Sequence, residues 1–230
     1  EAIEMLAAVK NEEIEAPVEE AIRQALENDG NGWGNGLTRV YDAMAMDYLY
    51  ADVNNIMIML GNHDMDRIAD VVKDQDPRRV KLANVLLATM RGIPQVFYGD
   101  EYGMKSADRS LGHSTLRMPL PLGEQVTPEQ KEMFDFQSRL FQWRKGEKVI
   151  HTGKTMHFMS RDNTYAYFRY NEEEAVFVFA NASEDARTIP TAHYAEILSL
   201  YNPVGVDVLT GETVDLSKTN IKVQPLSTLV

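Results

Sequence analysis

The stretch that decides the fold covers residues 56–64 and reads IMIMLGNHD. Its first five residues are all apolar, and a short uninterrupted apolar run is typical of a parallel strand covered on both faces. Gly61 and three polar residues, Asn62, His63 and Asp64, follow directly. Side chains at the carboxyl ends of parallel strands meet at one end of a sheet or barrel, so this stretch predicts a buried strand that leads into a site.

The same pattern returns further along the chain. Residues 80–90 have apolar side chains at helical spacing, and residues 93–98 (IPQVFY) form a second apolar run that leads into Asp100 and Glu101. Strand, helix and strand in this order predict successive βα units. Before them, helical spacing predicts helices over residues 1–29 and 37–48, separated by a glycine-rich loop that carries Trp33.

The pattern changes in the last third of the chain. A helix is predicted to begin at Thr127, because this N-cap residue is followed by Pro128 and by Gln130, which completes a capping box. Beyond it, residues 155–160, 164–170 and 175–181 are short, aromatic and β-branched, and a hairpin and a closing strand are expected over 206–216 and 221–230. We therefore predict an α/β plus all-β fold: the C-terminal part of a (β/α)8 barrel over residues 1–150, then an antiparallel β-sandwich over residues 151–230.

Composition excludes several kinds of partner. The chain has 23 Lys and Arg against 35 Asp and Glu, a net charge of −12, which would repel nucleic acid and anionic membrane surfaces. No apolar run approaches the roughly 18 to 20 residues of a membrane span. There is no cysteine for a disulfide or a thiolate metal site, and the histidines show no metal-ligand spacing. We expect neither nucleic acid, membrane nor metal as a partner, and the cellular location stays open.

A bare Asn-His-Asp tripeptide is as often a turn or a cap as a functional site. The order of motifs around it is more informative: a strand, Asn-His-Asp, Arg67, a helix, residues 91–94 (RGIP), a strand, and residues 98–101 (YGDE). In this order the chain resembles the last two βα units of the α-amylase family, and its neopullulanase and cyclomaltodextrinase branch is the nearest match. Residues 30–50, 117–123 and 143–145 extend the resemblance.

The resemblance implies a role for each polar residue after the first strand. Asp64 would be the carboxylate that stabilises the transition state, because glycoside cleavage develops positive charge that a fixed anion favours. Asn62, His63 and Arg67 would bind the sugar. The resemblance also implies α-glucan oligosaccharides as substrates and no required cofactor, and it allows a calcium ion in a longer parent protein.

Three further residues are weaker candidates for shaping the site. Asp100 and Glu101 lie at the same end as Asp64, where they either shape the site or anchor loops, and we favour loop anchoring. Trp33 lies in a loop, where its ring would either stack on a sugar or fill space among the protein's own side chains. Arg67 and Arg117 are natural partners for carboxylates.

Retaining hydrolysis also needs a nucleophilic carboxylate and an acid about 5 to 5.5 Å apart. The resemblance assigns both groups to earlier barrel strands. The glutamates upstream of Asp64 lie in helical sequence instead: Glu12, Glu13, Glu15, Glu19 and Glu20. Because the chain also begins at Glu1 without Met, we expect a piece of a longer retaining hydrolase that lacks nucleophile and acid and is inactive by itself.

Two alternatives stay open from the sequence. The chain as given would be an inert sugar-binding or structural fragment, with residues 1–150 stable only against the remaining barrel half or other copies of itself, and with the β-sandwich able to fold alone. The other alternative rests on Gly61, which stands where the family usually has an acidic residue. Gly-Asn-His-Asp also resembles a metal-binding motif of metallophosphoesterases, but residues 112–115 (GHST) lack the second histidine of that pattern.

Overall fold

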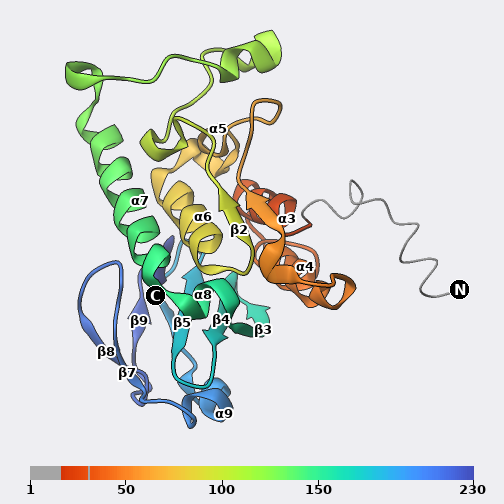
Figure 1. Cartoon of the computed structure of the whole chain (residues 1–230), viewed down its shortest axis with the longest axis vertical. Coiled ribbons are helices and arrows are strands. Elements are labelled where there is room, and N and C mark those ends of the chain that lie inside the picture. Colours follow the sequence, from red (N-terminus) through yellow and green to blue (C-terminus); the bar gives the residue numbers. More distant parts are fainter. Residues whose placement is uncertain (1–16, 31) are drawn as a thin grey trace, which may run out of the picture.

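The computed structural model describes residues 17–30 and 32–230, and it divides into a helical part and a β-rich part (Figure 1). The part of the predicted first helix that falls on residues 1–16 lies outside the described residues. The helices are α3 (Pro17–Glu27), α4 (Thr38–Ala45), α5 (Ile68–Val71), α6 (Pro77–Thr89), α7 (Pro128–Gly146), α8 (Lys148–Thr152) and α9 (Ala195–Leu198). Of the helices in this part of the chain, none is long and apolar enough to cross a membrane.

Strands β1 (Met57–Met59) and β2 (Ile93–Gln95) are parallel neighbours, joined through α6. The predicted βα unit is therefore present, although both strands are shorter than the apolar runs that predicted them. Met57 and Ile93 are 49% and 54% exposed, and within the described residues no further strand pairs with either of them. The two strands thus have open edges, which is where the neighbouring strands of a closed barrel would lie.

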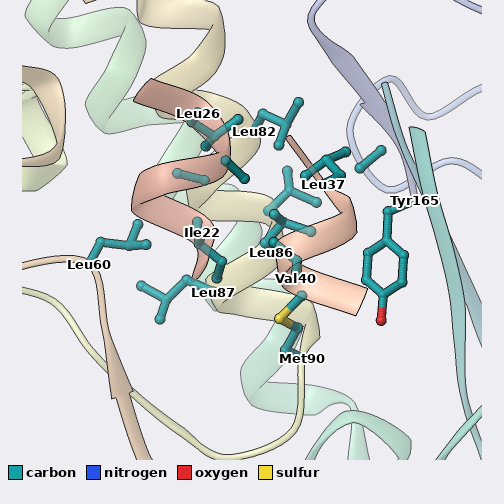
Figure 2. Close-up of a cluster of buried hydrophobic side chains, with 14 of the residues drawn as sticks. Ile22, Leu26, Leu37, Val40, Leu60, Leu82, Leu86, Leu87, Met90 and Tyr165 are labelled. Atoms are coloured by element: carbon teal, nitrogen blue, oxygen red, sulfur yellow. The ribbon is translucent and has the colours of Figure 1, made fainter. Parts of the chain in front are cut away.

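The core of the helical part lies between α3, α4 and α6 (Figure 2). Ile22 and Leu26 on α3 are one helical turn apart, so both face the same side, where they meet Val40 of α4 and Leu86 of α6. Burial of this shared apolar face stabilises the three helices together.

Helix α7 begins as predicted, with Thr127 as N-cap and a capping box that Gln130 completes. Its buried side packs on α6, where Gln137 donates a hydrogen bond of 2.6 Å to Asn84. Near its other end, the Arg144 guanidinium donates to the carbonyl oxygens of Ala88 and Gly92, at 2.6 and 2.7 Å. Carbonyl groups at a helix C-terminus have no partner within the helix, so Arg144 supplies one where α6 turns into β2.

The β-rich part contains a four-stranded antiparallel sheet with the strand order β10-β5-β4-β3. Two small antiparallel pairs, β6–β9 and β7–β8, accompany it. The strands are β3 (Lys154–Arg161), β4 (Thr164–Tyr170), β5 (Ala175–Asn181), β6 (Arg187–Thr188), β7 (Val204–Val206), β8 (Thr213–Asp215), β9 (Lys222–Val223) and β10 (Ser227–Leu229). The predicted strands, hairpin and closing strand are confirmed here, with the closing strand divided into β9 and β10.

The two faces of this sheet bury different cores. Phe168 and Phe179 pack on one face against α9 and the β6–β9 pair. Tyr165 and Tyr167 point to the other face, where they share the core of the barrel helices, and the hydroxyl of Tyr167 contacts that of Thr89 on α6. A face shared in this way conflicts with the expectation that the β-domain folds alone, because separation would expose it. The domain boundary near residue 150 stays a prediction.

Candidate active site

The polar residues after β1 form a turn that presents Asp64 to solvent. The side-chain oxygen of Asn62 accepts a hydrogen bond of 2.8 Å from the backbone N–H of Asp64, which closes an Asx turn. The Asp64 side chain is 61% exposed. Asn62 therefore acts on the backbone, as the turn interpretation expected, while it holds Asp64 at the carboxyl end of β1.

Basic side chains from two segments surround the Asp64 carboxylate. His63 places Nε2 3.0 Å from Oδ2, and Arg117 places Nη2 3.6 Å from Oδ1. Nδ1 of His113 lies 4.0 Å from the same Oδ1. His113 and Arg117 both come from residues 96–127, which connect β2 to α7 and which we call the β2–α7 segment. In Figure 1 this segment covers the end of the molecule that lies away from the β-domain.

The resemblance implied that Arg67 binds substrate, but the structure places its side chain in the interior. Its side chain is fully buried, with Nη1 donating to the carbonyl of Tyr98 at 2.9 Å and to Oδ1 of Asp100 at 2.8 Å. Nη2 donates to the carbonyl of Leu116 at 2.7 Å. Arg67 follows β1, and its contacts connect it to the residues after β2 and to Leu116 further along the β2–α7 segment. Arg67 therefore fixes the positions of these loops relative to one another, beneath the exposed Asp64.

Asp100 and Glu101 are loop anchors in the structure. Asp100 is buried, and this burial raises the pKa of its carboxyl to about 6, although Arg67 beside it acts in the opposite direction. Glu101 accepts a hydrogen bond of 2.7 Å from the backbone N–H of Gly99. Gly99 itself has a φ of 91°, a conformation that favours glycine. The preference for anchoring over direct site shaping agrees with these contacts.

The β2–α7 segment is also fixed to the residues that follow Asp64. Arg109 forms an ion pair with Asp66, and Ser106 donates to Asp70 through its backbone N–H at 2.8 Å and its hydroxyl at 2.6 Å. These contacts place His113 and Arg117 over Asp64. The sequence indicated Arg117 as a carboxylate partner but gave no signal for His113, whose position depends on a tertiary contact.

Gly61, the departure from the family pattern, leaves space beside two charged groups. A β-carbon at this position would lie 3.9 Å from Nη1 of Arg23 and 4.0 Å from Oδ2 of Asp100, which are ordinary contact distances. Arg23 instead donates to the carbonyl of Leu60 at 2.6 Å. A β-carbon would therefore fit at position 61, and the glycine leaves that space beside Arg23 and Asp100 open.

Trp33 lies on the loop between α3 and α4 and is 78% exposed, so it is not a packing plug. The far end of its loop rests on the β-domain, where the backbone N–H of Leu37 donates to Oδ1 of Asn163 at 2.9 Å. No contact in the described residues joins Trp33 to Asp64, and sugar stacking by Trp33 stays a prediction. The same part of the chain contains no group of three His, Asp or Glu side chains arranged to hold a metal ion.

The parallel strands β1 and β2, each followed by acidic residues, and the antiparallel β-domain after them fit the C-terminal part of a (β/α)8 barrel protein. The chain belongs to the α-amylase family: the family model described as "Alpha amylase, catalytic domain" matches residues 16–190. A second model, "Cyclo-malto-dextrinase C-terminal domain", matches residues 155–230. The family assignment confirms the resemblance and replaces the metallophosphoesterase alternative.

Curated relatives share this assignment at moderate identity. A 4-alpha-glucanotransferase of Thermotoga neapolitana is 29% identical over 148 residues, covering 57% of this chain and 33% of its own length. A maltogenic alpha-amylase of Bacillus acidopullulyticus is 24% identical over 187 residues, covering 76% and 30%. A cyclomaltodextrinase of Geobacillus thermopakistaniensis is 29% identical over 157 residues, covering 67% and 24%. The chain thus spans a third or less of the length of these relatives.

Solved structures confirm the fold class. The structure of AmyP in complex with maltose superposes with a TM-score of 0.73 at 18% identity, covering 93% of this chain and 48% of that one. The α-amylase of Geobacillus thermoleovorans, complexed with acarbose, gives a TM-score of 0.71 at 18% identity, covering 93% and 46%. At this identity the similarity establishes the fold, a partial α-amylase-type barrel followed by the β-domain, and nothing about residues.

Proposed function

We propose that this chain is part of a retaining glycoside hydrolase that cleaves α-glucosidic bonds in starch-derived oligosaccharides, and that Asp64 is its transition-state-stabilising carboxylate. The observation that carries the proposal is the position of Asp64: exposed, at the carboxyl end of a barrel strand, and held there by the Asn62 turn. The maltose and acarbose complexes of related folds support an oligosaccharide as the ligand.

The charges around Asp64 suit this role. Glycoside cleavage passes through an oxocarbenium-like state, and a fixed carboxylate favours its positive charge. His63, whose Nε2 lies 3.0 Å from Oδ2 of Asp64, orients the carboxylate and is proposed to bind the same sugar. In the proposal Arg117 is a further positioning group for Asp64, and Arg67 acts only through the loops that it joins.

The nucleophile and the general acid, in this proposal, lie on barrel strands outside these residues. The open edges of β1 and β2 and the half-exposed Met57 and Ile93 support a completed barrel, because neighbouring strands would cover them. The missing half, or other copies of this chain, would provide that cover. We propose no required cofactor, and a calcium ion remains part of the proposal only for a longer protein.

Turnover measurements test the proposal directly. The chain alone should release no reducing sugar from maltotriose, β-cyclodextrin or pullulan above the buffer rate, whereas a protein that also contains the preceding barrel strands should hydrolyse at least one of them. Retention is read from the anomer first formed, by proton NMR. Turnover by residues 1–230 alone would refute the proposal that the nucleophile and the general acid lie outside these residues. A longer protein that binds these sugars but never cleaves them would favour the inert sugar-binding alternative.

A further inference from the structure

A cavity of about 220 Å³ lies in the β-domain, separate from Asp64 and its neighbours. Its walls come from β4, β5, the β7–β8 hairpin and the end of α7. The aromatic side chains in the lining are Trp143, Phe168, Phe177 and Tyr201. Phe168 and Phe177 are buried, whereas Val206 at the hairpin is 63% exposed, so the cavity extends from the surface to the core of the sheet.

The cavity exists because one edge of β5 is only partly paired. The short strand β10 pairs with β5 as far as Leu229, which lies opposite Phe179. Beyond this point, over Ala175–Val178, the edge of β5 has no strand partner in the described part of the chain. The β7–β8 hairpin and this part of β5 line the same cavity, but the strands of the hairpin pair only with each other. The hairpin therefore covers the edge without closing against it.

Two polar side chains of the lining, Asp207 and Tyr201, have hydrogen-bond partners within the protein. Asp207 accepts hydrogen bonds from the backbone N–H of Val230 at 3.1 Å and from the hydroxyl of Thr210 at 2.6 Å. The hydroxyl of Tyr201 donates to the carbonyl of Asn171 at 2.5 Å. These side chains offer few partners, so the polar groups that remain are backbone groups on the open edge of β5, and they suit a largely apolar ligand that carries a single hydrogen-bonding group.

We propose that this cavity is a binding site for an uncharged aromatic molecule of one or two rings. An apolar cavity of about 150 Å³ is large enough for benzene, so about 220 Å³ has room for a larger ring system such as indole. Phe168 and Phe177, with ring centroids 4.7 Å apart, offer ring faces and edges for tilted or stacked contact. Of the lining residues in the structure, Asp207 is the one with a charged side chain, so an anionic ligand would be repelled.

Indole is the probe that tests this site, in the whole chain. Titration with indole, followed by ¹H–¹⁵N NMR, should produce saturable shifts in the amides of the lining residues. Indole-3-acetate, the anionic analogue, should bind at least about tenfold more weakly, because its carboxylate meets Asp207. Val214→Phe fills the cavity and should weaken indole binding by about tenfold or more, because the added ring occupies the space that indole needs.

The matched control is Val204→Phe, which adds the same ring to the same hairpin at a position outside the lining and should leave indole affinity unchanged. If Val214→Phe does not fold, as judged by circular dichroism, Ala175→Leu on β5 serves as the filling variant and decides the result. The absence of saturable shifts, equal affinity for the anion, or full affinity in the folded filling variant would each overturn the proposal. Hydrolysis is not measured, so the outcome is independent of the proposed function.

Discussion

Replacement of Arg67 by methionine should destabilise the chain strongly. The substitution keeps an unbranched side chain of similar length but removes the donors to Tyr98, Asp100 and Leu116. Hydrogen bonds to charged groups are worth about 1.5–3 kcal/mol each, and loss of the buried guanidinium recovers part of its desolvation cost. Breaking a buried ion pair by removing one partner typically costs about 3–5 kcal/mol, and we expect a loss of stability in this range.

Urea unfolding followed by circular dichroism at fixed protein concentration measures this loss. Arg109→Met is the matched control, because Arg109 belongs to the same region and pairs with Asp66 while 49% exposed. It should lower stability by no more than about 1 kcal/mol. Adding Asp100→Asn to Arg67→Met should restore part of the loss, since it removes the carboxylate left unpaired. A cost below about 1 kcal/mol for Arg67→Met, or strict additivity with Asp100→Asn, would refute the role assigned to Arg67.

Three further predictions follow from the fold and the site. Burial raises the pKa of Asp100 to about 6 from an ordinary value of 3.8, so the folded state binds more protons than the unfolded state between these pH values. The free energy of unfolding should therefore fall by about 3 kcal/mol from this group as the pH rises from about 4 to 6. In Asp100→Asn, this part of the pH dependence should vanish. Gly99→Ala should cost more than about 1 kcal/mol in urea unfolding, because its β-carbon would lie 2.5 Å from Sδ of Met104 at a φ of 91°, whereas Gly205→Ala, with open space around it, should not. Residues 151–230 alone should bind a dye for exposed apolar surface and lack a cooperative transition, because separation exposes the sheet face that packs on the barrel helices; a cooperative monomeric transition would contradict the shared core.

Local signals in the sequence predicted the elements that depend on local interactions. Helix α7 begins at the predicted capping box because Thr127 and Gln130 satisfy each other's backbone groups without help from the rest of the fold. The aromatic and β-branched residues over 164–170 likewise predicted strand β4, whose alternation puts Tyr165 and Tyr167 on one face and Phe168 on the other. In both cases the physical cause lies within a few residues.

The sequence did not reveal features that depend on distant partners. Arg67 lies three residues after Asp64 and was expected to bind sugar, but its guanidinium donates to three acceptors far along the chain. His113 comes within 4.0 Å of Asp64 because contacts with distant residues, among them Asp66 and Asp70, hold the β2–α7 segment above it. Side-chain direction at these positions is set by tertiary packing, to which spacing along the sequence gives no access.

The most direct test of the account is the rate of hydrolysis after Asp64→Asn, measured in a protein that contains the preceding barrel strands. The amide keeps the shape of the side chain and removes its charge, so kcat should fall by about 10²- to 10³-fold or more while KM changes little. Asp135→Asn, which removes an exposed carboxylate that pairs with Lys131 on α7, is the matched control and should keep kcat within a few-fold of the unaltered enzyme. A loss in kcat of less than about tenfold for Asp64→Asn, or an equal loss in both variants, would contradict the role of Asp64.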